Sequence, residues 1–268
     1  MFSMPLSPPP LYPIIDFSCF AAKPDPIMAI VRYAEELIAA GATLIQLRDK
    51  SPVSAGNQPG HADQENPTRR FLSCARELRR VTLDKATLIV NDRVDLCLAA
   101  DADGVHLGQD DLSPAAARKI FASVIAHTPG TPKQWVPHPF AAKPLQSFEL
   151  PSERVGEQTA VAMHKKLLIG FSTHNLSQVI AADALPIDYI AIGPVFATGS
   201  KANHDPVVGL DGVRQARQVT RKPLVAIGGI TRKNCSQVKA AGADAVAVIS
   251  DLLESPAKAV ADFLRVLG

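Results

Sequence analysis

Short apolar segments alternate with amphipathic stretches along most of the chain. The apolar segments fit buried strands at residues 11–16, 42–48, 87–90, 104–107, 167–171, 188–192, 223–227 and 243–249. A stretch of helical period follows each one, at about residues 26–38, 69–83, 94–98, 113–126, 176–184, 211–220, 233–241 and up to Leu267. Strands that alternate regularly with helices predict a parallel sheet. Eight such units predict a single (β/α)8 TIM barrel.

The competing fold is an open, doubly wound sheet. Its dinucleotide-binding form carries Gly-x-Gly-x-x-Gly after the first strand, and no such pattern follows Asp16. A weak internal repeat also favours the barrel, because residues 40–42, 100–104 and 241–244 each end a helix and begin an even-numbered strand. We therefore expect one barrel domain over residues 1–268.

Three segments depart from the regular pattern. Residues 1–10 form a proline-rich leader, which we expect to be disordered. Residues 51–67 are polar and predict a long loop at the same end of the sheet as Arg48, where loops often act as lids. Residues 127–163 carry several prolines and the only tryptophan, Trp135. This insertion follows a helix and precedes a strand, so we expect it at the opposite face of the barrel.

Composition and charge exclude several classes of partner. With 47% hydrophobic and 20% charged residues, the chain has the profile of an ordinary globular protein. Its net charge of +2 is too small to indicate a nucleic-acid or membrane partner. We find no secretory signal and no apolar segment of membrane-spanning length. Four widely spaced cysteines are typical of a reducing compartment, so we expect a cytoplasmic protein.

Acidic residues follow two neighbouring strands of the predicted barrel. Asn91 and Asp92 end the third strand, and Asp110 and Asp111 follow the fourth. Right-handed crossovers place the carboxyl ends of parallel strands on one face, so these side chains should be neighbours. His106, on the fourth strand, should point inward beside them.

Cations are expected at the same rim. Period-two alternation points Gln46, Arg48 and Lys50 in one direction from the second strand. Carboxylates that face cations predict a magnesium site that also holds a phosphorylated ligand. A structural ion-pair network between Arg48 and the acids is the alternative, and the residues alone leave it open.

A second anion site is predicted at the last two strands. Gly228 and Gly229 end the seventh strand, and Ile249 and Ser250 end the eighth. Barrels often bind phosphate between these two loops through backbone N–H groups, which glycine allows a ligand to approach closely. The glycine-rich loop at residues 193–203 adds Thr198, Ser200 and Lys201, for which an ordinary turn is the alternative reading.

Together these motifs resemble the thiamine phosphate synthase family. The series is Gln46-Leu-Arg-Asp-Lys50, Asn91-Asp-Arg, His106-Leu-Gly-Gln-Asp-Asp111, Gly170-Phe-Ser-Thr-His174, the loop from Gly193 to Lys201, Ile227-Gly-Gly-Ile-Thr231 and Ile249-Ser250. The resemblance covers most of the chain in order. It implies a (β/α)8 barrel that joins a hydroxymethylpyrimidine diphosphate to a thiazole phosphate with Mg²⁺, giving thiamine phosphate and pyrophosphate.

The resemblance also implies roles for individual residues. The pyrimidine diphosphate would be bound by Gln46, Arg48, Lys50, Asn91, His106, Ser172 and Lys201, with Arg48, Lys50 and Lys201 as the catalytic cations. The thiazole phosphate would be bound by Thr198, Ser200, Gly229, Ile249 and Ser250, and Mg²⁺ by Asp92 and Asp111. The chain departs from the family pattern at Ser200, where threonine is usual, at Asp110, where glutamate is usual, and in the two insertions.

Two other functions stay open. A thiazole tautomerase of the same fold would have no use for a diphosphate site, and a non-catalytic phosphate-ligand sensor would release no pyrophosphate. The full set of Arg48, Lys50, Asp92, Asp111 and Lys201 favours the synthase. The sequence does not define the oligomeric state, and a homo-oligomer is compatible with it.

Overall fold

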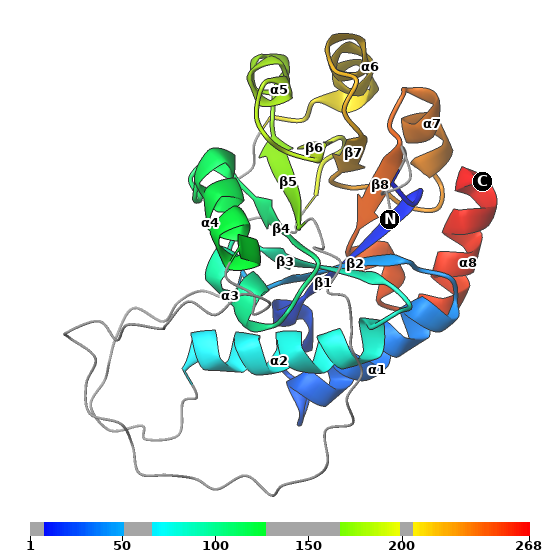
Figure 1. Cartoon of the computed structure of the whole chain (residues 1–268). Helices are drawn as coiled ribbons and strands as arrows, with labels where there is room; N and C mark the ends of the chain where they lie inside the picture. Colours follow the sequence, from blue (N-terminus) through cyan, green and yellow to red (C-terminus); the bar gives the residue numbers. More distant parts are fainter. Residues whose placement is uncertain (1–7, 51–65, 127–166, 199–205) are drawn as a thin grey trace, which may run out of the picture.

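The computed structural model describes residues 8–50, 66–126, 167–198 and 206–268. Eight parallel strands form a closed barrel in the order β1 to β8, and the helices surround it (Figure 1). The strands are β1 (Leu11–Asp16), β2 (Leu44–Arg48), β3 (Thr87–Asn91), β4 (Gly104–Leu107), β5 (Leu168–Thr173), β6 (Tyr189–Ile192), β7 (Leu224–Ile227) and β8 (Ala245–Val248). The helices are α1 (Pro26–Ala39), α2 (Pro67–Thr82), α3 (Val94–Ala99), α4 (Pro114–Ala126), α5 (Leu176–Asp183), α6 (Gly209–Val219), α7 (Cys235–Ala240) and α8 (Pro256–Leu267), with short 3-10 helices η1 (Phe17–Phe20) and η2 (Ser250–Leu252).

Side chains alternate between the barrel interior and the surface that faces the helices. The helix-facing side holds the larger apolar cluster, which includes Leu11 and Ile15 of β1. Side chains inside the barrel form a separate cluster of Tyr12, Ile14, Leu44, Ile89, Leu168, Tyr189, Ala191, Val225, Ala245 and Ala247. Small residues alternate with large ones in this interior: a Cβ at Gly170 would lie 2.0 Å from Cζ of Tyr189. The interior is therefore a packed core, as in other barrels of this type.

The predicted (β/α)8 barrel is confirmed, and the predicted strand limits agree with the structure to within two residues. The helix limits were less accurate. Helix α2 begins at Pro67, before the predicted start, because Oδ1 of Asn66 accepts hydrogen bonds from the N–H groups of Thr68 and Arg69. Helix α6 begins at Gly209, two residues before its predicted start, and no side chain caps it.

Helix α7 begins at Cys235, later than the predicted start at Lys233. A turn occupies the preceding residues, because Oδ1 of Asn234 accepts a hydrogen bond from Thr231 N and Asn234 N donates to Thr231 O. The predicted disorder of residues 1–10 is wrong at its end: Pro8 is buried, and the Pro10 carbonyl accepts a hydrogen bond from Val246 N at 2.9 Å.

Several predictions fall outside the described residues. These are the rest of the leader, residues 51–65 of the predicted lid loop and the insertion at residues 127–163. In the chain the insertion lies between α4 and β5, and β5 begins at the amino-terminal end of the barrel. None of the helices within the described ranges combines the length and apolarity needed to cross a membrane.

An arginine–aspartate unit repeats at the amino-terminal ends of the strands. An aspartate directly before β4, β6 or β8 accepts a hydrogen bond from a backbone N–H of the preceding strand, at 2.7, 2.8 and 2.7 Å respectively. The same carboxylate pairs with an arginine at 3.3, 2.6 and 2.8 Å respectively. That arginine lies on the helix that leads into the preceding strand, which is α2, α4 or α6. The units are Asp103 with Leu88 and Arg79, Asp188 with Ile169 and Arg118, and Asp244 with Leu224 and Arg217.

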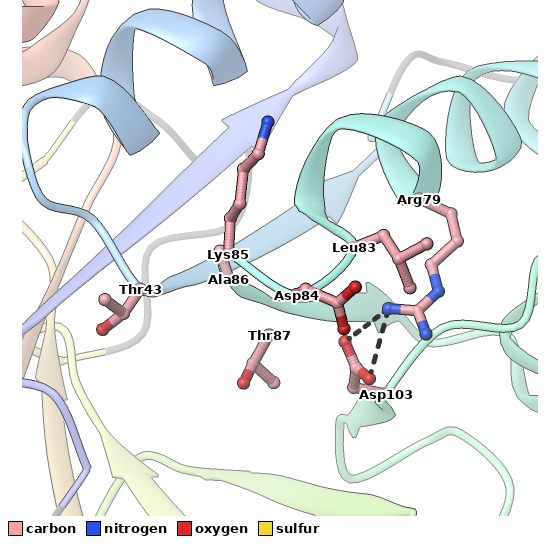
Figure 2. Close-up of a pocket in the computed structure, with 8 residues that line it drawn as sticks. All are labelled: Thr43, Arg79, Leu83, Asp84, Lys85, Ala86, Thr87 and Asp103. Carbon is pink, nitrogen blue, oxygen red and sulfur yellow. Dashed lines mark hydrogen bonds and ion pairs between the residues drawn. The ribbon is translucent and has the colours of Figure 1, made fainter.

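These units explain the internal repeat seen in the sequence, since two of its copies contain Asp103 and Asp244. Before β2 the equivalent position is Thr43, which cannot form the ion pair. Figure 2 shows the Arg79 guanidinium directed at the Asp103 carboxylate beside a hollow of about 310 Å³ that Thr43 also lines. Each unit ties a helix to two strands, so it stabilises the closed barrel.

We expect Asp188→Ala to lower the free energy of unfolding by about 2–4 kcal/mol, because it leaves Arg118 and the Ile169 N–H without their shared acceptor. Urea unfolding followed by circular dichroism measures this change. The matched control is Glu77→Gln, which removes an exposed i,i+3 pair with Arg80 and should change stability by less than about 1 kcal/mol. Equal effects of the two substitutions would contradict the stabilising role of the unit.

Candidate active site

The second strand sends two polar side chains into the barrel near its carboxyl-terminal rim. Gln46 and Arg48 are both buried, with 2% and 8% of their surface exposed. Strand pairing places Gln46 beside Ile14 of β1 and Ile89 of β3, at an interior position. Arg48 stands one interior position further along, beside Asp16. The predicted common direction of these side chains is confirmed.

Lys50 follows β2 and reaches the end of β3. Its Nζ lies 2.6 Å from Oδ2 of Asp92, and its side chain remains 48% exposed. Asp92 adopts a left-handed backbone conformation with φ of 63°, which aspartate tolerates better than most residues. Its N–H donates to the His106 carbonyl at 2.8 Å, which holds the turn after β3 against β4.

Asp111 comes to the same place from the loop after β4. The Gly108 N–H donates a hydrogen bond to its Oδ2 at 2.7 Å. Burial raises the pKa of Asp111 above its ordinary value; the Gly108 hydrogen bond opposes this shift, and a hydrogen bond and repulsion from Asp92 reinforce it. The prediction that the two acidic strand ends meet is therefore confirmed for Asp92 and Asp111. Asp110 is exposed beside them.

Asp16, at the end of β1, is a residue of this site that the sequence reasoning did not single out. Its Oδ2 lies 3.5 Å from Nε of Arg48, and both side chains are nearly inaccessible to solvent. Its Oδ1 accepts hydrogen bonds from N and Oγ of Ser18, at 3.1 and 2.6 Å. The carboxylate thus fixes the direction of a buried guanidinium. An acid at the end of the first strand was the available signal, but only the register of β1 on β2 shows its partner.

A chain of hydrogen bonds crosses the barrel interior below this rim. Nε2 of Gln46 donates to the Tyr12 hydroxyl at 2.8 Å, and the hydroxyls of Tyr12 and Tyr189 lie 2.9 Å apart. The Tyr189 hydroxyl lies 3.0 Å from Nδ1 of His106, and Nε2 of His106 lies 2.9 Å from Oγ of Ser172. Three residues predicted in the site are therefore connected through two tyrosines that the sequence analysis did not identify.

The loops after β6 and β7 pack tightly on each other at the far side of the rim. Val195 N donates to Ile227 O, and Phe196 N donates to Gly228 O, at 2.9 and 3.0 Å. Gly229 has a φ of 63°, and a Cβ there would lie 2.7 Å from the Ala197 carbonyl oxygen. Loop packing therefore requires glycine at position 229, whether or not the backbone there also approaches a ligand.

Residues predicted for the second anion site lie along this side. Register pairs Ile227 with Ala247, so Gly229 and Ile249 stand at the same level after adjacent strands. Ser250 begins η2 and is exposed, and Thr198 is half-buried. Asn91 is buried at the end of β3, paired in register with His106. Ser200 and Lys201 lie outside the described residues.

The hollow drawn in Figure 2 belongs to the other end of the barrel. Its lining includes Thr43, Thr87 and Asp103, which lie before or at the starts of β2, β3 and β4. Its arginine and aspartate belong to the repeated structural unit described above. The candidate site is therefore the carboxyl-terminal rim, where this fold places its catalytic groups. Fold and rim together define the class as that of (β/α)8-barrel enzymes.

Comparison with known proteins identifies the family within this class. The family model described as thiamine monophosphate synthase matches residues 18–134 and 151–252. The thiamine-phosphate synthase of Koribacter versatilis is 42% identical over 97% of this chain and 96% of its own length. That of Chloroflexus aurantiacus is 36% identical over 81% and 74%. The chain belongs to the thiamine monophosphate synthase family, which confirms the resemblance found in the sequence.

A solved structure agrees with this assignment. The thiamine phosphate pyrophosphorylase from Pyrococcus furiosus has a TM-score of 0.65 and 27% sequence identity, covering 96% of this chain and 95% of its own. A geranylgeranylglyceryl phosphate synthase from Thermoplasma acidophilum has a TM-score of 0.55 at 15% identity, which reflects the shared barrel fold.

Asp111→Asn should raise the melting temperature at neutral pH in magnesium-free buffer. Because the folded-state pKa of Asp111 is raised, the folded chain holds this proton to higher pH than the unfolded chain does. Stability is therefore lost as pH rises from the ordinary aspartate pKa through the raised one, and the loss persists above it. The asparagine removes the ionisation and can keep an oxygen toward Gly108.

Differential scanning calorimetry at pH 7 and near pH 4 measures this effect, which should shrink at the lower pH. The control is Asp110→Asn, which changes the exposed neighbouring carboxyl and should leave the melting temperature unchanged. A lower melting temperature of Asp111→Asn at pH 7 would contradict the electrostatic interpretation.

Proposed function

We propose that this protein is a thiamine phosphate synthase. It would join a hydroxymethylpyrimidine diphosphate to a thiazole phosphate and release pyrophosphate. The observation that carries this proposal is the convergence of Arg48, Lys50, Asp92 and Asp111 at one rim, in a chain of this family. A barrel that bound only one monophosphate would have no evident use for this second group of charges.

The diphosphate end of the site is assigned to the cations. Lys50 is half-exposed beside Asp92, so it can meet an anion that enters from solvent. Arg48 is buried and held in place by Asp16, so it would face that anion from the barrel interior. Lys201 completes the predicted cation set. Gln46, Asn91, His106 and Ser172 line the interior next to them and would hold the pyrimidine ring.

Asp92 and Asp111 are the residues that would hold Mg²⁺. They fit this ion because two neighbouring carboxylates supply hard oxygen ligands, and the raised pKa of Asp111 reflects burial and repulsion that a divalent cation would relieve. Within the described ranges no group of three or more His, Cys, Asp and Glu residues could enclose a metal. Waters and substrate phosphate would therefore complete the coordination, and bound Mg²⁺ would neutralise charge on the departing pyrophosphate.

The thiazole phosphate is assigned to the opposite side of the rim. Gly229, Ile249 and Ser250 stand together after β7 and β8, with Thr198 on the loop after β6 and Ser200 further along that loop. The two phosphate sites would then lie across the barrel mouth from each other. The thiazole nitrogen could approach the pyrimidine methylene between them.

The chemistry that suits these groups is a dissociative substitution. The bond from the pyrimidine methylene to the diphosphate oxygen breaks, the ring delocalises the resulting cation, and the thiazole nitrogen forms the new bond. Arg48, Lys50 and Lys201 stabilise the negative charge that develops on the leaving pyrophosphate. No protein nucleophile is needed, and the chain's contribution is to position both substrates and exclude water.

The purified chain, incubated with both substrates and Mg²⁺, should release pyrophosphate and form thiamine phosphate in equal amounts. An enzyme-coupled phosphate assay and chromatography of the product measure the two. No pyrophosphate should be released when either the thiazole phosphate or the pyrimidine diphosphate is omitted. Binding of the thiazole phosphate without any turnover would favour the sensor, and conversion of a thiazole isomer alone would favour the tautomerase.

Asp92→Asn should lower the magnesium-dependent kcat by at least about 100-fold while the chain stays folded. Asparagine tolerates the left-handed backbone of Asp92, so the change acts on charge. Asp84→Asn is the matched control, because Asp84 has a φ of 60° and lies at the opposite end of the barrel. Steady-state kinetics across magnesium concentrations measures the effect. Wild-type activity of Asp92→Asn would contradict a metal-binding role and would indicate that Asp92 and Asp111 have a structural role.

A further inference from the structure

The hydrogen-bond chain from Gln46 to Ser172 has a definite polarity. Both phenols keep their protons, because burial raises the pKa of Tyr12 and of Tyr189 well above the usual range. Each hydroxyl therefore has one hydrogen to donate. The Tyr12 oxygen already accepts from Nε2 of Gln46, so the Tyr12 hydroxyl is available to donate to Tyr189.

The remaining donors then follow in order. The Tyr189 hydroxyl, having accepted from Tyr12, donates to Nδ1 of His106. An imidazole that accepts at Nδ1 is neutral and carries its proton on Nε2, which donates to Oγ of Ser172. The opposite direction would leave the buried Tyr12 hydrogen without an acceptor in this chain, since both neighbours would donate to its oxygen. Ser172 therefore has its own O–H hydrogen left for a ligand.

Packing holds the two tyrosines where the hydrogen-bond chain requires them. The Tyr12 and Tyr189 rings meet edge to face at 5.9 Å, and the Tyr189 and His106 rings stack at 5.5 Å. Gly170 leaves the space for the phenol, because a Cβ there would lie 2.3 Å from the Tyr189 hydroxyl oxygen. A rigid interior thus fixes both hydroxyls, although neither tyrosine reaches the rim.

We propose that Tyr12 and Tyr189 are positioning residues that couple the amide orientation of Gln46 to the hydroxyl orientation of Ser172. The coupling leaves Oε1 of Gln46 as an acceptor and Ser172 as a donor for the ligand. A ring that carries an amino group as donor and a ring nitrogen as acceptor has the complementary pattern. This choice of ligand rests on the proposed function, because the aminopyrimidine of that reaction carries both groups; the polarity itself does not.

The polarity can be tested without substrate. In long-range ¹H–¹⁵N correlation spectra of ¹⁵N-histidine-labelled protein, His106 should appear as the neutral tautomer protonated at Nε2. Its signals are assigned by their loss in His106→Gln. Tyr189→Phe should move these signals, and Tyr33→Phe should not, because the buried Tyr33 hydroxyl has no hydrogen-bond partner among the described residues. A ring protonated at Nδ1 in the wild-type protein would overturn the proposal, whatever reaction the protein catalyses.

The action through Ser172 is tested by a double-mutant cycle. Tyr189→Phe should raise KM for the pyrimidine diphosphate about tenfold and leave KM for the thiazole phosphate within about twofold, as expected for one hydrogen bond in the chain. In a Ser172→Ala background the same change should have less than about a twofold effect, because the end of the chain is already missing. Equal effects in both backgrounds, or equal changes in both KM values, would show that Tyr189 serves the fold alone.

Discussion

Closure of the barrel is the constraint on which the rest of the molecule depends. The β1–β8 pairing joins Leu11 to Val246, and the Pro10 carbonyl accepts a hydrogen bond from Val246 N. With the ring complete, every strand delivers its last residues to one rim. Tyr12 then meets Tyr189, although these two residues are separated by 177 positions in the chain. No local segment could assemble this contact.

The two ends of the barrel satisfy different requirements. At the amino-terminal end, Asp103, Asp188 and Asp244 each find both an arginine and a backbone N–H, so burial of their charge is compensated. At the other end, Asp111 is partly buried against another carboxylate and its pKa is raised. The left-handed Asp92 lies in the same place. The unfavourable electrostatics of Asp111 thus lie at the rim, away from the three arginine–aspartate units, as expected where function limits stability.

Much of the fold could be predicted from sequence because strand limits coincide with changes of polarity. The limits of β1 and β4 agree with the prediction, since apolar runs there end at Asp16 and before Gly108. Helix starts were harder. No capping side chain marks α6, and at α7 the Thr231–Asn234 turn has a composition that also fits a first helical turn. Predicted site residues on the strand ends lie together for the same topological reason that made the barrel predictable.

The two tyrosines missed by sequence reasoning share a physical cause. Tyr12 and Tyr189 lie on short strands rich in apolar residues, and a tyrosine there is indistinguishable from core packing until its hydroxyl has a partner. Gly170 likewise resembles any glycine within a strand, but its missing side chain leaves the space that Tyr189 fills. Because a buried hydroxyl requires both a donor and an acceptor role, two such groups placed in series transmit direction as well as stability. The interior of this barrel can therefore set the polarity of groups at its rim.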